Sequence, residues 1–341
     1  MKLKGRAGSR AITVLATASL LLGVTAAVGS SSSAFATNYS ESVVAHRDAS
    51  TSPSIWYINP LTTYPLFTAQ QVAFKAAAAK YGYAATVVGS SAINIPEQIS
   101  YINQAVTSGA KAIIYFDLDP ATYSKTVAAA QAKGVVMISM GGIDTFSDYA
   151  VGTGYQGFGQ TAAQTIAKNA GTAANVVVFG NDLSNPSQAT PYHVFQAYAK
   201  LHYPKMKSTY VFTHASPTTT SSLLESLPQA YPKANAIWFV EGGDDSVITS
   251  SLKHAGVKKG KYFILAIDNV PTTLAQISSG YVTQTLAQCV FWATPFGAQL
   301  ALAKIAGNGP SQQTWNIGLL AVGKSQLPFS GCPSSAYPTL P

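Results

Sequence analysis

The stretch EQISYINQAVTSGAKAIIYFDLDPATYSKTVAAAQAKGVVMISM, residues 97–140, holds two short apolar runs on either side of a helical pattern. The runs at 112–116 and 135–140 are apolar at nearly every position, which is typical of strands covered on both faces. Apolar residues three and four apart predict a helix over 121–133. Because strand, helix and strand in this order form a crossover between parallel strands, the stretch predicts a parallel sheet.

The same alternation continues from residue 54 almost to the end of the chain. We expect strands at 55–59, 84–88, 112–116, 135–140, 149–152, 175–179, 209–213, 236–240, 262–267 and 282–287. We expect helices at 69–81, 96–107, 121–133, 157–169, 189–201, 221–231, 246–255 and 294–305. Ten strands with their helices are too many for a single sheet of ordinary size. The sequence therefore predicts an α/β chain with two Rossmann-like, doubly wound parallel-sheet lobes.

The N-terminus has the pattern of an export signal. Four basic residues within the first ten precede an apolar stretch at 11–29, and Ala-Phe-Ala at 34–36 supplies a small-x-small cleavage pattern. This order predicts a signal peptide over residues 1–36 and export to the periplasm or the extracellular face of the cell membrane. An uncleaved membrane anchor is the alternative, because the apolar stretch nearly spans a bilayer. Residues 37–53 are polar and predict a flexible leader.

Composition excludes several classes of protein. Hydrophobic residues make up 47% of the chain and charged residues 10%, which favours packed cores over disorder. The formal net charge is +8, and removing residues 1–36 takes away four basic residues and no acidic one, leaving +4. No run of Lys or Arg remains, so we expect no nucleic-acid partner.

The two cysteines, Cys289 and Cys332, lie in the last sixth of the chain. In an exported protein their expected use is a disulfide, which would tie the tail at 332–341 to the body of the last domain. Two separate buried thiols are the alternative. Two cysteines without a neighbouring histidine cannot form a structural zinc site, so we expect neither a metal nor another cofactor.

Residues at the predicted carboxyl ends of the strands are the candidates for a ligand site, because doubly wound sheets bind ligands there. These residues are aromatic, acidic, amide-bearing or glycine: Tyr64, Phe67, Asp117, Gly141, Gly142, Tyr155, Asn181, Asp182, Glu241, Asp268 and Gln288. Aromatic rings cover the apolar faces of a sugar, while carboxylates and amides bond its hydroxyls. The set predicts a neutral, polyhydroxylated ligand. For any single residue, a helix cap or turn is the alternative role.

Several segments resemble, in order, the periplasmic sugar-binding proteins of the ribose-binding type. SIWYINPLTTYPLFTAQQVAFKAAAAKYGY (54–83) resembles that family's first strand, loop and helix, and residues 97–140 its next segment. AVGTGYQGFGQTAAQTIAK (150–168) is similar to its crossover between lobes. AIWFVEGGDDSVITSSLKHAG, FILAIDN and YVTQTLAQ follow in the expected order, so that the resemblance covers roughly residues 54–325.

The resemblance implies the type I periplasmic binding protein fold, with two lobes joined by a three-segment hinge. The N-terminal lobe would hold 54–153 and about 289–318, and the C-terminal lobe 154–288 and about 319–331, with crossovers near 153, 269–288 and 318. It implies no enzyme but the substrate-binding component of an ABC transporter. Such a monomer closes on a sugar or polyol and presents it to a membrane permease; a chemoreceptor is a further candidate partner.

The family's pocket maps onto this sequence only in part. Asp268 and Gln288 fall where the family has polar groups that bind sugar hydroxyls, and Phe67 falls on one of its two stacking rings. The strand-end rule and the resemblance together predict a ligand site formed by Tyr64, Phe67, Asp117, Gly142, Tyr155, Gln188, Glu241, Asp268 and Gln288.

The largest departures from the family pattern concern arginine. Gly141-Gly142 stands where sugar binders carry an Asp-Arg pair, and Ala189, beside Gln188, replaces a second arginine. Because these guanidinium groups grip pairs of hydroxyls, their loss leaves open a larger, more apolar pocket or a different ligand.

Two other functions remain open at the level of sequence. The same fold binding an aromatic compound, a nucleoside or an amino acid is one. An exported enzyme with an interlobe active site is the other, and a histidine within reach of a serine or carboxylate in the cleft would favour it.

Two further classes are disfavoured. The motif G-x-G-x-x-G at Gly152, Gly154 and Gly157 follows a fifth strand, and no acid comes before Asp182, whereas a dinucleotide fingerprint opens its domain. We therefore interpret it as a hinge. Repressors that share the two-lobed fold need an N-terminal helix-turn-helix, where this chain has its predicted signal.

Overall fold

The computed structural model describes residues 53–329 and 331–333. The predicted signal peptide, almost all of the predicted leader and most of the tail lie outside these residues. Within the described part, no helix combines the length and apolar character needed to cross a bilayer.

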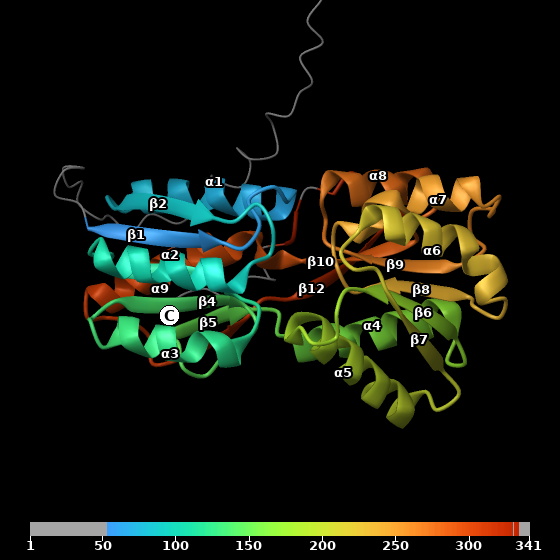
Figure 1. Cartoon of the computed structure of the whole chain (residues 1–341), viewed down its shortest axis with the longest axis horizontal. Helices are drawn as coiled ribbons and strands as arrows, with labels where there is room; N and C mark the ends of the chain where they lie inside the picture. The colour runs from blue at the N-terminus through green and yellow to red at the C-terminus, as the bar shows by residue number, and fades with distance from the viewer. Residues whose placement is uncertain (1–52, 330, 334–341) are drawn as a thin grey trace, which may run out of the picture. The chain divides into compact units, whose positions relative to one another are not determined.

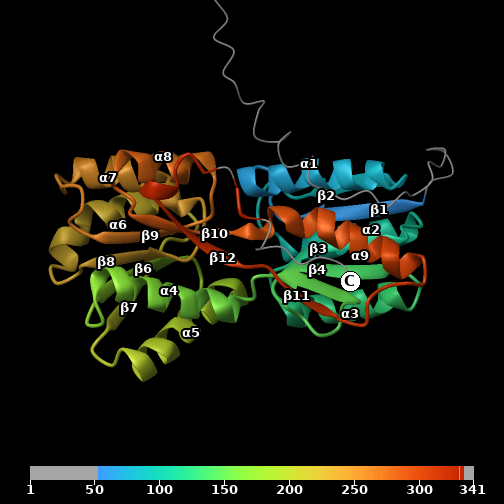
Figure 2. The same ribbon diagram turned by 180° about the vertical axis from the view of Figure 1, so that it is seen from behind.

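The first sheet has six strands in the order β11-β5-β4-β3-β1-β2, and all of its pairings are parallel. Figure 1 labels most of these strands, and Figure 2 labels β3 and β11. With its helices it forms what we call the first lobe. The strands are β1 (Ser54–Asn59), β2 (Ala84–Gly89), β3 (Ala112–Asp117), β4 (Val136–Gly141), β5 (Tyr149–Gly152) and β11 (Thr314–Asn316). The helices are α1 (Pro65–Lys80), α2 (Ile95–Thr107), α3 (Pro120–Gln131) and α9 (Ala293–Ile305).

The second sheet, in the second lobe, has the order β12-β10-β9-β8-β6-β7, and only β12 runs antiparallel to its neighbour. Its strands are β6 (Asn175–Gly180), β7 (Lys207–Phe212), β8 (Ala236–Phe239), β9 (Phe263–Ile267), β10 (Gln284–Gln288) and β12 (Leu319–Gly323). The helices are α4 (Tyr155–Ala170), α5 (Pro186–His202), α6 (Pro217–Ala230), α7 (Ile248–His254) and α8 (Pro271–Ser279). Short 3-10 turns are η1 (Asp244–Val247), η2 (Cys289–Trp292) and η3 (Lys324–Gln326).

Each sheet is covered by helices on both faces, which explains the continuous apolar runs. In β3 and β4 every residue is buried. Along β1, Tyr57 faces a core formed with α1 and α9, while its neighbour Ile58 faces a separate core formed with α2 and α3. The second sheet is likewise covered by α4 and α5 on one face and by α6 and α7 on the other. The prediction of two α/β lobes with doubly wound sheets is confirmed.

Three segments carry the chain between the lobes, at 153–154 between β5 and α4, after Gln288, and at 317–318 between β11 and β12 (Figure 2). They are joined by backbone hydrogen bonds. The N–H of Ile317 donates to the carbonyl of Gly152 over 2.8 Å, and the N–H of Cys289 to that of Gly318 over 3.4 Å. One crossover was expected near 269–288; α8 and β10 of the second lobe fill most of this range, and the chain crosses at its end, after Gln288.

The glycine motif at this crossover has a structural explanation at two of its three positions. A Cβ at Gly152 would collide with the backbone of Gly141, and Gly154 adopts a φ of 64° as the residue preceding α4. Only glycine adopts such a φ without strain. Gly157 lies inside α4 and faces open space. The close approach of two backbones and the turn therefore account for the motif without a phosphate.

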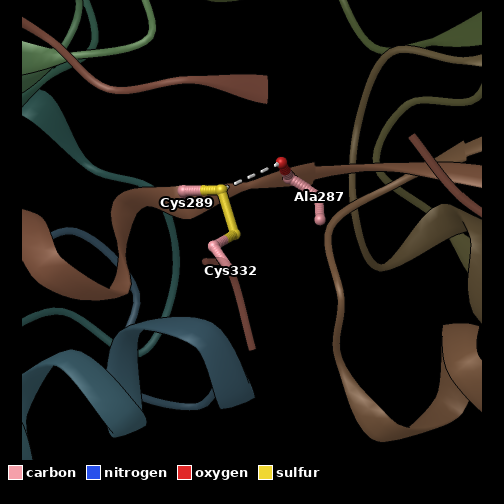
Figure 3. The surroundings of a disulfide bond; sticks show 3 residues. All are labelled: Ala287, Cys289 and Cys332. Carbon is pink, nitrogen blue, oxygen red and sulfur yellow. Dashed lines mark hydrogen bonds between the residues drawn. A yellow bond between two sulfur atoms is a disulfide. The ribbon is translucent and has the colours of Figure 1, made fainter. Parts of the chain in front are cut away.

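The predicted disulfide is confirmed: Cys289 and Cys332 are bonded, with their Cα atoms 5.8 Å apart (Figure 3). Cys289 directly follows β10, and Cys332 packs against the core under α1 and α9. The bond therefore fastens the start of the tail next to the second crossover.

Candidate ligand-binding site

The loop after β1 is positioned by the buried side chain of Asn59. Its Oδ1 accepts the N–H of Leu61 over 2.8 Å, and its Nδ2 donates to the carbonyl of Phe67 over 3.4 Å. Tyr64 then precedes α1, with Pro65 as the first helical residue. This local bonding holds Tyr64 at the carboxyl end of the first sheet.

Tyr64 hydrogen-bonds across the sequence to the second lobe. Its hydroxyl donates to Oδ2 of Asp268 over 2.8 Å, and Nε2 of Gln288 donates to Oδ1 of the same carboxylate over 2.8 Å. Burial and the negative charges of Asp268 and Asp245 raise the pKa of Tyr64 well above its usual range, so the phenol stays protonated. The structure thus brings together three of the predicted site residues, Tyr64, Asp268 and Gln288.

Asp268 is held in an uncommon backbone conformation, with a φ of 65°. Its N–H donates to the carbonyl of Leu286, and its own carbonyl accepts the hydroxyl of Thr285 over 2.6 Å. Non-glycine residues rarely adopt this φ, and such strain gathers at functional positions. Burial raises the pKa of Asp268, while the hydrogen bonds from Tyr64 and Gln288 oppose the rise.

Gly242 completes this group, and the sequence analysis did not identify it. A Cβ at Gly242 would collide with the hydroxyl of Tyr64 and would lie 2.5 Å from Oδ2 of Asp268. The Gly-Gly pair after β8 is visible in the sequence. The reason for glycine at this position is visible only in the structure, because Tyr64 and Asp268 come from distant segments.

A second group forms at the ends of β3 and β4. The hydroxyl of Tyr155 donates to the backbone carbonyl of Asp117 over 2.5 Å. A Cβ at Gly142 would lie 3.1 Å from the Tyr155 ring and 3.5 Å from Oδ2 of Asp117. The structure therefore brings Asp117, Gly142 and Tyr155 together, as the strand-end rule leads one to expect.

The carboxylate of Asp117 makes no well-formed hydrogen bond. The residue is completely buried, and the N–H of Asp119 acts on its carboxylate without forming a bond of good geometry. Burial, and next the charges of Asp144 and Asp119, raise its pKa to about 8, against a small opposing effect of the Asp119 N–H.

A row of aromatic rings leads from Tyr64 to the end of β3. The Tyr64 and Phe67 ring centres lie 5.8 Å apart, and Phe67 meets Phe116 edge to face at 5.1 Å. Phe116 immediately precedes Asp117. Phe67 is only 8% exposed, so most of its ring is covered by the protein itself.

A third group lies in the second lobe, around Gln188 and Tyr210. A Cβ at Gly180 would collide with the Tyr210 hydroxyl and would lie 3.2 Å from Oε1 of Gln188, which is buried without a partner. The Tyr210 hydroxyl donates to the carbonyl of Asn181 over 2.9 Å.

Glu241 acts electrostatically on both Tyr64 and Tyr210, raising the pKa of each. Its own pKa is raised to about 8 by burial and by the charge of Asp244. Tyr210 and Asp244 were not predicted from the sequence, because their positions beside Glu241 depend on how distant strands pack.

The predicted site residue Asp182 has an ordinary structural role, and the histidines of the described residues lie on the surface. Asp182 is exposed and accepts the N–H of Ser184 over 2.8 Å, which is a local turn bond. All histidines in the described part are exposed; His254 pairs with Glu225 on α6, and His214 lies near Asp182.

Comparison with known proteins identifies the family and the fold of the chain. A family model described as the periplasmic binding protein domain matches residues 55–309. The chain belongs to this family. Its members are binding proteins rather than enzymes as a rule, and no curated protein sequence matches the chain significantly.

Solved structures of solute-binding proteins share the fold at low sequence identity. An ABC transporter solute-binding protein from Burkholderia graminis, in complex with D-arabinose, is 20% identical with a TM-score of 0.76. The match covers 82% of this chain and 98% of that one. GanP, a glucose-galactose binding protein from Geobacillus stearothermophilus, is 17% identical with a TM-score of 0.74, covering 82% and 99%. A chain of the XylFII–LytSN complex is 20% identical with a TM-score of 0.73, covering 81% and 99%.

Proposed function

We propose that the protein is an exported solute receptor of an ABC importer, and that it binds a small polyhydroxylated ligand at the carboxyl ends of its two sheets. The observation that carries the proposal is the group formed by Tyr64, Asp268 and Gln288. It joins the loop after β1 in the first lobe to the ends of β9 and β10 in the second.

The chemistry of this group suits hydroxyl ligands. A carboxylate that already accepts two hydrogen bonds is fixed in orientation, and amide and phenol groups beside it both donate and accept. The similar structures from Burkholderia graminis and Geobacillus stearothermophilus are described as sugar-binding. The similarity to the XylFII–LytSN complex makes a sensor protein a second candidate partner beside a permease.

The mechanism follows from the three crossovers. A ligand that contacts both lobes binds their closed arrangement more tightly than their open one, so it shifts that equilibrium by its difference in affinity. The Gly152–Ile317 and Cys289–Gly318 bonds make the crossovers one connected strap. We expect the lobes to move as bodies about this strap.

The experiment is a thermal-shift screen of the purified protein against sugars, polyols, nucleosides and amino acids. A solute that binds only the folded state stabilises it by about 2.7 kcal/mol at a hundredfold excess over Kd. We expect one class of hydroxylated solutes to raise Tm, and Asp268→Ala to abolish the shift. Glu225→Gln, on the outer helix α6, is the control and keeps it. A screen in which no solute shifts Tm contradicts the proposal.

A further inference from the structure

Among the described residues, no basic side chain is buried at the strand ends. The sequence has three arginines, Arg6, Arg10 and Arg47, and all precede the described residues. Every lysine from Lys75 to Lys324 is exposed. Asp117, Glu241 and Asp245 have raised pKa values. The charged groups that affect them are other carboxylates, with no lysine or histidine among them.

The acids, in contrast, gather there. Glu241 and Asp244 follow β8, and besides burial the charge of Asp244 raises the pKa of Glu241. The charges of Asp268 and Asp244 likewise add to the effect of burial on Asp245. Asp117 lies at the end of β3 in the other lobe. Burial raises the pKa of each of these carboxyls.

Several oxygens of these acids make no well-formed hydrogen bond within the protein. They are both carboxylate oxygens of Asp117 and Oε2 of Glu241, whereas the hydroxyls of Thr213 and Thr220 act on the carboxylate of Asp244. A buried acid that serves the fold looks different. Asp144 accepts the hydroxyls of Tyr115 and Ser147 and two backbone N–H groups.

Asp117 is the decisive residue. It is completely buried, and its Oδ2 faces Gly142 and Tyr155 within the candidate site. A buried polar group without a partner destabilises the fold, and more strongly when it is charged. Such a group persists where a ligand is its partner.

We propose that the site binds a ligand with a positively charged amine, such as an amino sugar, and that Asp117 and Glu241 face this charge from the two lobes. The inference rests on the proposed function as a solute receptor, and it names the class of solute. It explains why the Gly141-Gly142 and Ala189 positions have lost arginine, because a guanidinium there would repel the ligand.

Two further observations fit an organic cation. Among the described residues, no three of His, Cys, Asp or Glu come together as they would around a metal ion. The rings of Tyr64 and Tyr155 stand beside the acids, and aromatic faces attract ammonium groups.

The test is isothermal titration calorimetry with matched probes. D-Galactosamine and D-glucosamine are each compared with the neutral parent sugar and with the N-acetyl derivative, which keeps the nitrogen but lacks the charge and adds an acetyl group. Choline and 1,5-diaminopentane represent amines that are not sugars. We expect the amine of a matched set to bind at least tenfold more tightly than its two neutral counterparts.

Two variants locate the charge. Asp117→Asn and Glu241→Gln keep the shape of the side chains, and each should reduce the preference for the amine about tenfold or more. Glu225→Gln removes a charge outside the site and should leave the preference unchanged. Because the Asp117 carboxylate has no well-formed hydrogen bond to lose, we expect Asp117→Asn to fold normally.

The outcomes separate the two proposals. Binding of neutral sugars as tightly as amino sugars overturns the inference and leaves the receptor function standing. Binding of choline or diaminopentane alone supports the cationic site and contradicts a sugar as ligand. Absence of binding to every probe, together with a silent thermal-shift screen, contradicts both.

Discussion

At the scale of single residues, Asp117 shows how burial and function conflict. The strand-end rule nominated it from the sequence, because it follows an apolar run that had to be a strand. The lack of well-formed hydrogen bonds to its carboxylate was not predictable. Gly142, directly after β4, and Tyr155, at the start of α4, lie next to Asp117 only in the folded chain. The same holds for Gly242, whose collision partners Tyr64 and Asp268 are 204 residues apart.

A first prediction concerns pH and Asp117. In the folded protein its pKa is about 8, raised from 3.8, so between these values the folded state binds the proton more tightly than the unfolded state. The stability from this group is therefore complete at low pH and is lost as pH rises from about 4 to about 8. Glu241, with a pKa of about 8, and Asp245, with a pKa of about 7, act in the same direction.

The groups that face Asp117 are Asp119, Asp144 and the phenols of Tyr115, Tyr123 and Tyr155. None of them brings a positive charge. We expect Asp117→Asn to melt a few degrees above the wild type at pH 8.5, with the difference vanishing near pH 4.

Asp148→Asn is the matched control, because that carboxylate accepts the N–H of Met137 and pairs with Lys304. It should lower Tm at pH 8.5. A melting curve in which Asp117→Asn behaves like Asp148→Asn would contradict the assignment of Asp117 as a carboxylate without a well-formed hydrogen bond. Calorimetric melts across this pH range make the comparison.

A second prediction concerns Gly242. A methyl group there must displace the Tyr64 hydroxyl or Asp268, so Gly242→Ala should weaken ligand binding at least tenfold and destabilise the fold by about 1–3 kcal/mol. Gly157→Ala is the control, since it meets open space inside α4 and should stabilise the helix by up to about 1 kcal/mol. Titration of both variants with one solute decides. Equal affinities would show that Gly242 is not part of the site.

At the scale of elements, the sequence predicted those that bury a full face and missed those that do not. The expected strands at 112–116 and 135–140 correspond to β3 and β4, buried throughout. Helix α8 was not expected, because it has only nine residues and four of them are Ser or Thr. Strand β11 has three residues and β12 runs antiparallel at a sheet edge, so neither has the apolar run of a buried parallel strand.

A third prediction concerns the disulfide. It closes a sequence separation of 43 residues, and removing a link of that length costs about 4 kcal/mol in the chain-entropy model. We expect Cys332→Ser to lower the free energy of unfolding by about 2–4 kcal/mol, measured by urea titration. Ligand affinity should change less than twofold, because neither cysteine takes part in the hydrogen bonds that hold Tyr64, Asp268 and Gln288 together. A large loss of affinity with little loss of stability would place the bond in the site instead.

At the scale of the whole molecule, pattern and order along the chain were enough to predict two doubly wound lobes, because each strand–helix unit repeats the same local rule. The ligand was not predictable in the same way. Considered one by one, the residues at the carboxyl ends of the strands favour a ligand with hydroxyl groups. Only the packed structure shows that Asp117 and Glu241 keep oxygens without a well-formed hydrogen bond and that every lysine of the described residues is exposed.

The central claim is that a solute contacts both lobes and draws them together. Small-angle X-ray scattering of the purified protein, with and without a saturating amount of the solute that raises Tm most, tests it directly. We predict a decrease in the radius of gyration on binding for the wild type, and none for Asp268→Ala at the same solute concentration. A solute that binds with one-to-one stoichiometry and leaves the radius of gyration unchanged would contradict the account.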